Sequence, residues 1–232
     1  MAKPNLLIKL AFITGLREVV LTEIRQYSNL RVIKKDAPDF IYIDFVKDIA
    51  EIMRLRSVSR AYLVIQDRKY NPAYISSHKS IIGNLVEQAV KGREKGFKDF
   101  KLSCAGSNSP EARSLIEYVE RTYRLKEKED SNMTIHIVKN DGIWEVGVQI
   151  TPKPLSLRNY RVKSMGGAMN PTIAYAMNSL CKLEDASSYL NVFSGSATLL
   201  IEAAQCFPSL EELCDGVPVA RNTPRIFRAN RP

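Results

Sequence analysis

The stretch SYLNVFSGSATLLIEAAQ, Ser188 to Gln205, is the most informative part of this sequence. A short apolar run ends in a turn of small residues, which leads directly into a segment with the apolar spacing of an amphipathic helix. Small residues let backbone N–H groups approach a ligand closely, and a helix N-terminus favours anions. The pattern therefore indicates either a nucleotide-binding turn of an α/β fold or a tight strand-to-helix connection without a ligand.

Other catalytic signatures are missing from the sequence. The turn lacks both the Gly-Lys-Ser/Thr of a P-loop and a full G-x-G-x-x-G. The two histidines, His78 and His136, have no partners with which to assemble a Ser/His/Asp arrangement. The four cysteines are widely scattered, which excludes a zinc ribbon and favours reduced thiols inside the cell. We expect no catalytic residue and no metal site in these residues.

Length and hydropathy are typical of a globular protein of one or two domains. The chain has 232 residues, of which 45% are hydrophobic and 25% charged. No apolar run approaches the roughly 18 residues that a membrane span needs. The opening MAKPNLLIKLAF has too short an apolar stretch and no small-residue cleavage site for a signal peptide. We therefore expect a cytoplasmic protein that does not contact membranes.

Positive charge is concentrated in the N-terminal two-thirds of the chain. The formal net charge is +9; residues 1–160 carry 27 Lys+Arg against 19 Asp+Glu, and residues 161–232 carry 7 against 6. This excess favours a polyanionic partner such as nucleic acid or acidic lipid, although a solvated basic surface would give the same count. The densest basic stretch is KGREKGFKDFK, and Arg113 follows near an expected helix start. Its cations, candidates for phosphate contacts, are Lys91, Arg93, Lys95, Lys98 and Lys101.

The first 66 residues predict the element order β-α-β-β-α-β, which is the ferredoxin-like arrangement. Strands are expected at 6–13, 32–33, 40–45 and 61–65. Between them, apolar residues at helical spacing predict helices from Leu16 to Tyr27, with Thr14 as the cap, and over 49–55.

A second α+β unit is expected to follow. A helix over 75–90 leads through the basic stretch to a short strand at Leu102, and Ser109 and Pro110 are typical of the start of the next helix. Two strands then flank Asn140-Asp141-Gly142, a strong hairpin signal. Beyond a proline-containing linker, Pro171 marks the start of another helix.

The order of these parts resembles the THUMP-containing RNA methyltransferases, enzymes that methylate guanine N2 in tRNA or rRNA with S-adenosylmethionine. Six segments, spread over residues 5–212, carry the likeness. They are GLREVVLTEI (15–24), MRLRSVSRAYLVI (53–65), FKLSCAGSNSPEARS (100–114), PLSLRNYRV (154–162), GAMNPTIAYAM (167–177) and NVFSGSATLLIEAA (191–204).

The resemblance implies an α+β chain in five parts. These are an N-terminal ferredoxin-like domain (1–66), a THUMP RNA-binding domain (67–151), a linker (152–165), the incomplete start of a Rossmann-like methyltransferase domain (166–213) and an irregular tail (214–232). It further implies that S-adenosylmethionine would contact Asn170, Pro171, Thr172, Asn191, Phe193, Ser194, Gly195, Ser196, Ala197 and Thr198. RNA would be bound by the cations named above, together with Arg158 and Arg161.

The sequence departs from the family at the cofactor motif. Asn191 stands where the family has Asp, Val192 where it has Pro, and Ala197 where it has the second Gly. The Asp/Asn-Pro-Pro-Tyr/Phe loop that receives the target base is absent from these residues. The resemblance therefore implies a protein that binds structured RNA, with tRNA the expected ligand, and that is inactive alone. The alternatives are a methyltransferase completed by a partner chain and an interaction module that does not bind RNA.

Overall fold

The computed structural model describes residues 6–34, 37–90, 97–106, 108–140, 142–161, 166–181, 183–186, 188–191, 195–207 and 211–213. The chain divides into two compact units. Unit 1 combines residues 1–11, 28–52 and 60–153; unit 2 combines residues 12–27, 53–59 and 154–232. None of the helices in the described part of the chain is both long and apolar enough to cross a membrane.

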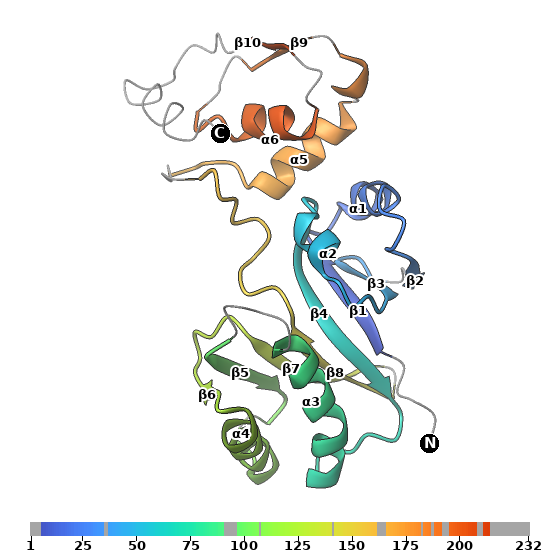
Figure 1. The fold of residues 1–232 in the computed structure, drawn as a ribbon, viewed down its shortest axis with the longest axis vertical. Helices are drawn as coiled ribbons and strands as arrows, with labels where there is room; N and C mark the ends of the chain where they lie inside the picture. Colours follow the sequence, from blue (N-terminus) through green and yellow to red (C-terminus); the bar gives the residue numbers. More distant parts are fainter. Residues whose placement is uncertain are drawn as a thin grey trace. The chain divides into compact units, whose positions relative to one another are not determined.

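A mixed eight-stranded sheet forms the centre of unit 1 (Figure 1). Its strand order is β2-β3-β1-β4-β8-β7-β5-β6. The strands are β1 (Leu6–Phe12), β2 (Val32–Lys34), β3 (Phe40–Asp44), β4 (Val58–Asp67), β5 (Asp99–Cys104), β6 (Lys126–Glu127), β7 (Thr134–Asn140) and β8 (Ile143–Gln149).

Strand β4 joins the two halves of this sheet. It lies between β1 and β8, and its pairing with β8 is antiparallel, with Leu63 opposite Val148. The pairs β1–β3 and β7–β8 are antiparallel as well, whereas β5 runs parallel to both β7 and β6. The boundary predicted between residues 66 and 67 falls at the last residues of β4. Both predicted N-terminal parts therefore contribute strands to one sheet.

Two helices, α3 (Ile75–Val90) and α4 (Pro110–Tyr123), lie on one face of the β5–β8 half (Figure 1). Because side chains alternate along a strand, every second residue faces these helices. Ile135, Val146 and Val148 are buried in this way, as is Leu85 of α3. The start predicted for α4 is confirmed: Ser109 Oγ accepts a hydrogen bond from the backbone N–H of Ala112, and Pro110 is the first helical residue.

Unit 2 contains three longer helices and a short parallel strand pair. α1 (Arg17–Ile24) packs against α5 (Pro171–Leu180) through Val19, Tyr175 and Ala176. α6 (Thr198–Cys206) follows β9 (Ser188–Leu190), which pairs in parallel with β10 (Glu211–Leu213). The described residues also include the short helices η1 (Leu183–Asp185) and α2 (Ala50–Arg54), of which α2 spans the boundary of the two units in the sequence. The predicted cap Thr14 is wrong, because α1 begins after Leu16 without a side-chain cap.

A buried carboxylate crosslinks four strands of unit 1. Glu145 of β8 forms an ion pair with Lys9 of β1 at 2.8 Å and contacts His136 Nε2 at 3.1 Å. It also accepts hydrogen bonds from the hydroxyl of Tyr42 and from Nε2 of Gln66. Burial opposes ionisation of Glu145, but the hydrogen bonds from His136, Lys9 and Tyr42 outweigh it. The pKa of Glu145 therefore lies well below its ordinary range.

We expect Glu145→Gln to destabilise the fold by about 3–5 kcal/mol at neutral pH, because it leaves the Lys9 ammonium partly buried without its counter-ion. The lowered pKa of Glu145 means that the unfolded state binds more protons as the pH falls below the ordinary value of 4.5. The advantage of the wild type over the variant should therefore be full above about pH 4.5 and shrink below it.

Urea unfolding of both proteins at several pH values measures this difference. Glu117→Gln is the control, because Glu117 lies on the exposed surface of α4 and pairs only with the exposed Arg121. A gap between wild type and Glu145→Gln that stays constant down to pH 3 would contradict the ionised state assigned to Glu145.

Candidate functional site

The predicted cofactor turn is a left-handed turn at the start of α6. Its described part runs from Gly195 to Ala197; Phe193 and Ser194 lie outside the described residues. Gly195 has φ 50° and Ala197 has φ 59°, so both adopt the left-handed conformation. This conformation costs a residue with a Cβ roughly 1 kcal/mol more than it costs glycine. Ala197 therefore occupies, at some energetic cost, a position that suits the glycine of the resembling family.

The N-terminus of α6 has no side-chain cap. Ser196 and Thr198 are buried, and their hydroxyl oxygens lie 2.9 Å apart and bond to each other. The cap is missing because the N-cap residue, Ala197, has no polar side-chain atom. Among the described residues no side chain caps this helix end, and a helix N-terminus of this kind suits a polar or anionic ligand.

The second predicted segment, Asn170 to Thr172, begins α5. Asn170 Oδ1 accepts a hydrogen bond of 2.9 Å from the backbone N–H of Thr172, and Pro171 is the first helical residue, so these two residues start the helix. The hydroxyl of Thr172 is fully buried and has no hydrogen-bond partner among the described residues. Leaving a hydroxyl in that state costs about 1–3 kcal/mol, which a bound water or ligand would recover.

Helices α5 and α6 pack against each other, and Asn178 Nδ2 donates a 2.9 Å hydrogen bond to the carbonyl of Leu199. Asn191 lies partly buried just after β9. Within the described ranges, however, no recorded hydrogen bond joins residues 170–172 to residues 195–198. The structure thus places the two predicted segments on neighbouring helices without linking them directly.

A buried carboxylate on α6, which the sequence analysis did not single out, organises this unit. Glu202 is fully buried and accepts from Arg56 Nη1 at 2.9 Å, from Arg158 Nε at 2.9 Å and from the Tyr160 hydroxyl at 2.8 Å. Arg158 also donates to the backbone carbonyls of Arg56 and Leu155. A lone acidic residue within the apolar run LLIEAA was the available signal for such a site.

A second buried carboxylate, Glu23 of α1, holds the backbone just before β4. It accepts from the N–H groups of Arg56 and Ser57, at 2.6 and 2.9 Å, and from the Ser57 hydroxyl. Burial raises the pKa of Glu23 above its ordinary value, and these hydrogen bonds only partly oppose that effect. Arg56 therefore bridges the two sites, Glu23 through its backbone and Glu202 through its guanidinium.

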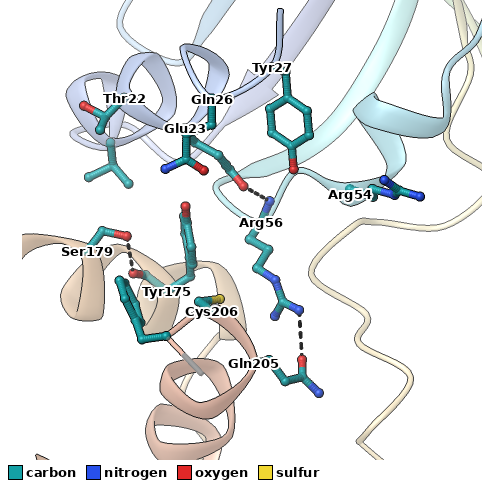
Figure 2. Close-up of a pocket in the computed structure, with 12 residues that line it drawn as sticks. Thr22, Glu23, Gln26, Tyr27, Arg54, Arg56, Tyr175, Ser179, Gln205 and Cys206 are labelled. Carbon is teal, nitrogen blue, oxygen red and sulfur yellow. Dashed lines mark hydrogen bonds between the residues drawn. The ribbon is translucent and has the colours of Figure 1, made fainter. Parts of the chain in front are cut away.

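A pocket of about 500 Å³ lies beside this bridge, within unit 2 (Figure 2). Arg56 extends between Glu23 and Gln205, and its Nη2 donates to Gln205 Oε1 at 2.9 Å. The lining is mainly polar: Thr22, Glu23, Gln26, Tyr27, Arg54, Arg56, Tyr175, Ser179, Gln205 and Cys206, with Val19 and Phe207.

This pocket does not coincide with the predicted cofactor turn. Gln205 and Cys206 close α6, whereas the turn opens it, so the two lie roughly 10 Å apart along the nine-residue helix. Burial raises the pKa of the Cys206 thiol to about 11, which keeps it protonated at neutral pH. No group of three or more His, Cys, Asp or Glu side chains among the described residues could hold a metal ion.

The predicted RNA-contacting cations fall into three classes. Lys98 and Arg113 are exposed, and Lys101 and Arg161 are partly exposed. Arg158 has only 10% of its side chain exposed and is engaged by Glu202, so we leave it out of the proposed RNA surface. Lys91, Arg93 and Lys95 lie outside the described residues.

Comparisons with known proteins agree with a methyltransferase-like fold. Residues 158–214, about a quarter of the chain, match the family model of the RMKL-like methyltransferase domain. The structure is similar to TrmN from Thermus thermophilus, with TM-score 0.69 and 19% identity over 97% of this chain and 69% of that one. No curated protein matches the chain.

Two further solved structures share the fold. A "possible methylase" from Clostridium difficile 630 gives TM-score 0.60 and 18% identity over 88% of this chain and 56% of that one. SMU.472, solved in complex with SAH, gives TM-score 0.57 and 14% identity over 98% of this chain and 64% of that one. The chain thus spans 56 to 69% of the length of these three structures.

We expect Glu202→Gln to destabilise unit 2 by about 3–5 kcal/mol, because Arg56 and Arg158 lose their shared counter-ion in a buried site. Tyr160→Phe removes one hydrogen bond to the same carboxylate and should cost about 1 kcal/mol. Chemical denaturation measures both changes, with the exposed Glu18→Gln on α1 as a control expected to change stability by less than about 1 kcal/mol. Equal effects of Glu202→Gln and Glu18→Gln would contradict the network.

Proposed function

We propose that this protein binds structured RNA, with tRNA as the expected ligand, and that it is related to the S-adenosylmethionine-dependent enzymes that methylate guanine N2. One observation carries the proposal: a methyltransferase-like segment at residues 158–214 follows 157 residues that carry 26 Lys+Arg against 19 Asp+Glu, a net charge of +7. A basic N-terminal part ahead of a methyltransferase-like segment suits an enzyme family that must hold a polyanion while it modifies it.

The arrangement of β1 to β4 supports a ferredoxin-like N-terminal domain. These strands and the helices α1 and α2 follow one another as β-α-β-β-α-β, and the strands order as β2-β3-β1-β4. Residues 67–151 would then be the THUMP domain. The free thiols of Cys104 and Cys206 support a place in the reducing cytoplasm.

The described residues of the cofactor turn fit part of S-adenosylmethionine. Gly195 and Ala197 have left-handed backbone, and α6 begins at Thr198 without a side-chain cap. The Thr172 hydroxyl is a buried polar atom without a partner among the described residues. These groups would hold the polar methionine end of the cofactor, which supplies an activated methyl group on sulfur. The similar SMU.472 structure was solved with SAH, which supports a cofactor of this class but not the individual residues.

We propose that these 232 residues are inactive by themselves, because the base-receiving loop of the resembling family is not among them. A second candidate function is an enzyme that is completed by further polypeptide, and two features of unit 2 favour it. Ile173, Met177 and Leu180 form an exposed apolar stripe along α5, with Leu180 at 70% exposure. Parallel strands such as β9 and β10 are ordinarily buried on both faces of a larger sheet. Both features suit additional elements packed against unit 2.

Gel shifts with unmodified tRNA test RNA binding. Phosphate contacts release counter-ions, so affinity should fall steeply as the salt concentration rises. Replacing Lys98 or Arg113 by Gln should weaken binding to all RNAs and lower the salt slope by about one each. Arg121→Gln, on the same helix but paired with Glu117, is the matched control. A tRNA affinity that does not depend on salt would reject the phosphate contacts. The absence of any shift would reject RNA binding and favour an interaction module of another kind.

Calorimetry and a tritiated S-adenosylmethionine assay test the catalytic half of the proposal. We expect no incorporation into tRNA above background by these residues alone, because the base-receiving loop of the resembling family is not among them. Reproducible incorporation would refute this. A saturable heat of binding with S-adenosylmethionine, without incorporation of tritium into tRNA, would favour an enzyme that further polypeptide completes.

A further inference from the structure

The strand register gives the sheet of unit 1 a second face, opposite the face that packs on the core. Ile8 and Leu10 of β1 are buried on the core face, so Leu7 and Lys9 point the other way. The same alternation puts Tyr42 of β3 and Tyr62 of β4 on this second face. We call it the aromatic face and define it by Lys9, Phe40, Tyr42, Tyr62, Glu145 and His136.

These six residues form a continuous row across five neighbouring strands, β3, β1, β4, β8 and β7. The rings of Phe40 and Tyr42 meet edge to face, with their centres 5.4 Å apart, and Lys9 Nζ lies 4.0 Å from the centre of the Phe40 ring. Farther across the sheet, the rings of Tyr62 and His136 also meet edge to face, with their centres 5.2 Å apart. With strands about 4.8 Å apart, the row spans roughly 19 Å.

The aromatic rings pack against a small hydrophobic cluster on the same face of the sheet. Leu7, Tyr42 and Val64 form a buried cluster, and Phe40 and Tyr62 pack against it while staying partly exposed. On β8, Gly147 allows His136 to lie directly over the backbone, because a Cβ at position 147 would overlap the imidazole. The exposed rings are therefore fixed in place before any ligand arrives, which limits the entropy lost on binding.

The charges of this face suit a polyanion. Glu145, its central carboxylate, is only 2% exposed and is surrounded by the donors of Lys9, Tyr42, His136 and Gln66. It therefore presents no free negative charge to a ligand. The partly exposed charged side chains that the register adds are two cations, Arg60 of β4 and Lys101 of β5, and two carboxylates, Asp44 of β3 and Asp99 of β5. Asp99 forms an ion pair with Lys128 at 3.5 Å, so its negative charge is balanced.

We propose that the aromatic face is a stacking platform for a short single-stranded segment of RNA. Aromatic rings on a sheet can stack two or three unpaired bases, while nearby cations neutralise the phosphates. Phe40 and Tyr62 supply the stacking surfaces, and Arg60 and Lys101 lie where the phosphodiester chain would pass. This inference rests on the proposed RNA binding and adds to it a surface separate from the Lys98 and Arg113 contacts.

Binding of a fluorescent oligouridine of about 12 nucleotides tests the platform, because oligouridine has no secondary structure of its own. The comparison ligand is an abasic oligomer with the same number of phosphates. Stacking predicts at least a tenfold preference for the ligand with bases. Phe40→Leu and Tyr62→Leu, which keep the apolar cover over Val64, should each weaken oligouridine binding by roughly tenfold.

Tyr74→Leu is the matched control, since Tyr74 is 62% exposed but lies in the loop before α3. Equal affinity of wild type for the two oligomers would overturn the platform, and this comparison does not depend on any variant folding. Phe40→Leu and Tyr62→Leu proteins that fold and bind oligouridine like Tyr74→Leu would overturn it as well. If the wild type does not bind tRNA at all, the proposed function itself is rejected, and this result is distinct from those that overturn the platform.

Discussion

The buried carboxylate of Glu202 is the interaction on which unit 2 depends. Three segments far apart in the sequence meet there: the residues before β4, the linker and α6. Each contributes a group that is costly to bury alone, and each is satisfied only because the others are present. The arrangement explains why a short loop around Arg158, without helix or strand, has a defined conformation. It also fixes the middle of α6, five residues after the N-cap Ala197.

Unit 1 uses the same device at Glu145. In both units a single carboxylate draws donors from several elements, and removing it would leave at least one cation without its counter-ion. The two sites differ in what surrounds them. Glu202 lies among packed helices, whereas Glu145 lies beneath a row of aromatic rings on a sheet. The first site therefore orders the core of its unit, and the second also shapes a surface.

Much of the fold could be predicted from the sequence because its signals are local. Ser109-Pro110 and Asn170-Pro171 start helices through contacts within three residues, and the turn ending at Gly142 joins two strands as expected. The strands β6 and β10 were not predicted, since two or three residues carry no periodicity. Arg158 was predicted to contact RNA because a sequence shows a cation but not its partner, and that partner is 44 positions away.

The close approach of His136 to the Gly147 backbone ties two positions of the sheet together. A ring at 136 needs a residue without a side chain opposite it on β8, and any larger residue at 147 would displace the ring and with it the edge of Tyr62. Among related chains, the two positions should therefore covary: glycine kept with a ring, and both lost together. Such covariation would record selection on the surface of the sheet separately from selection on its core.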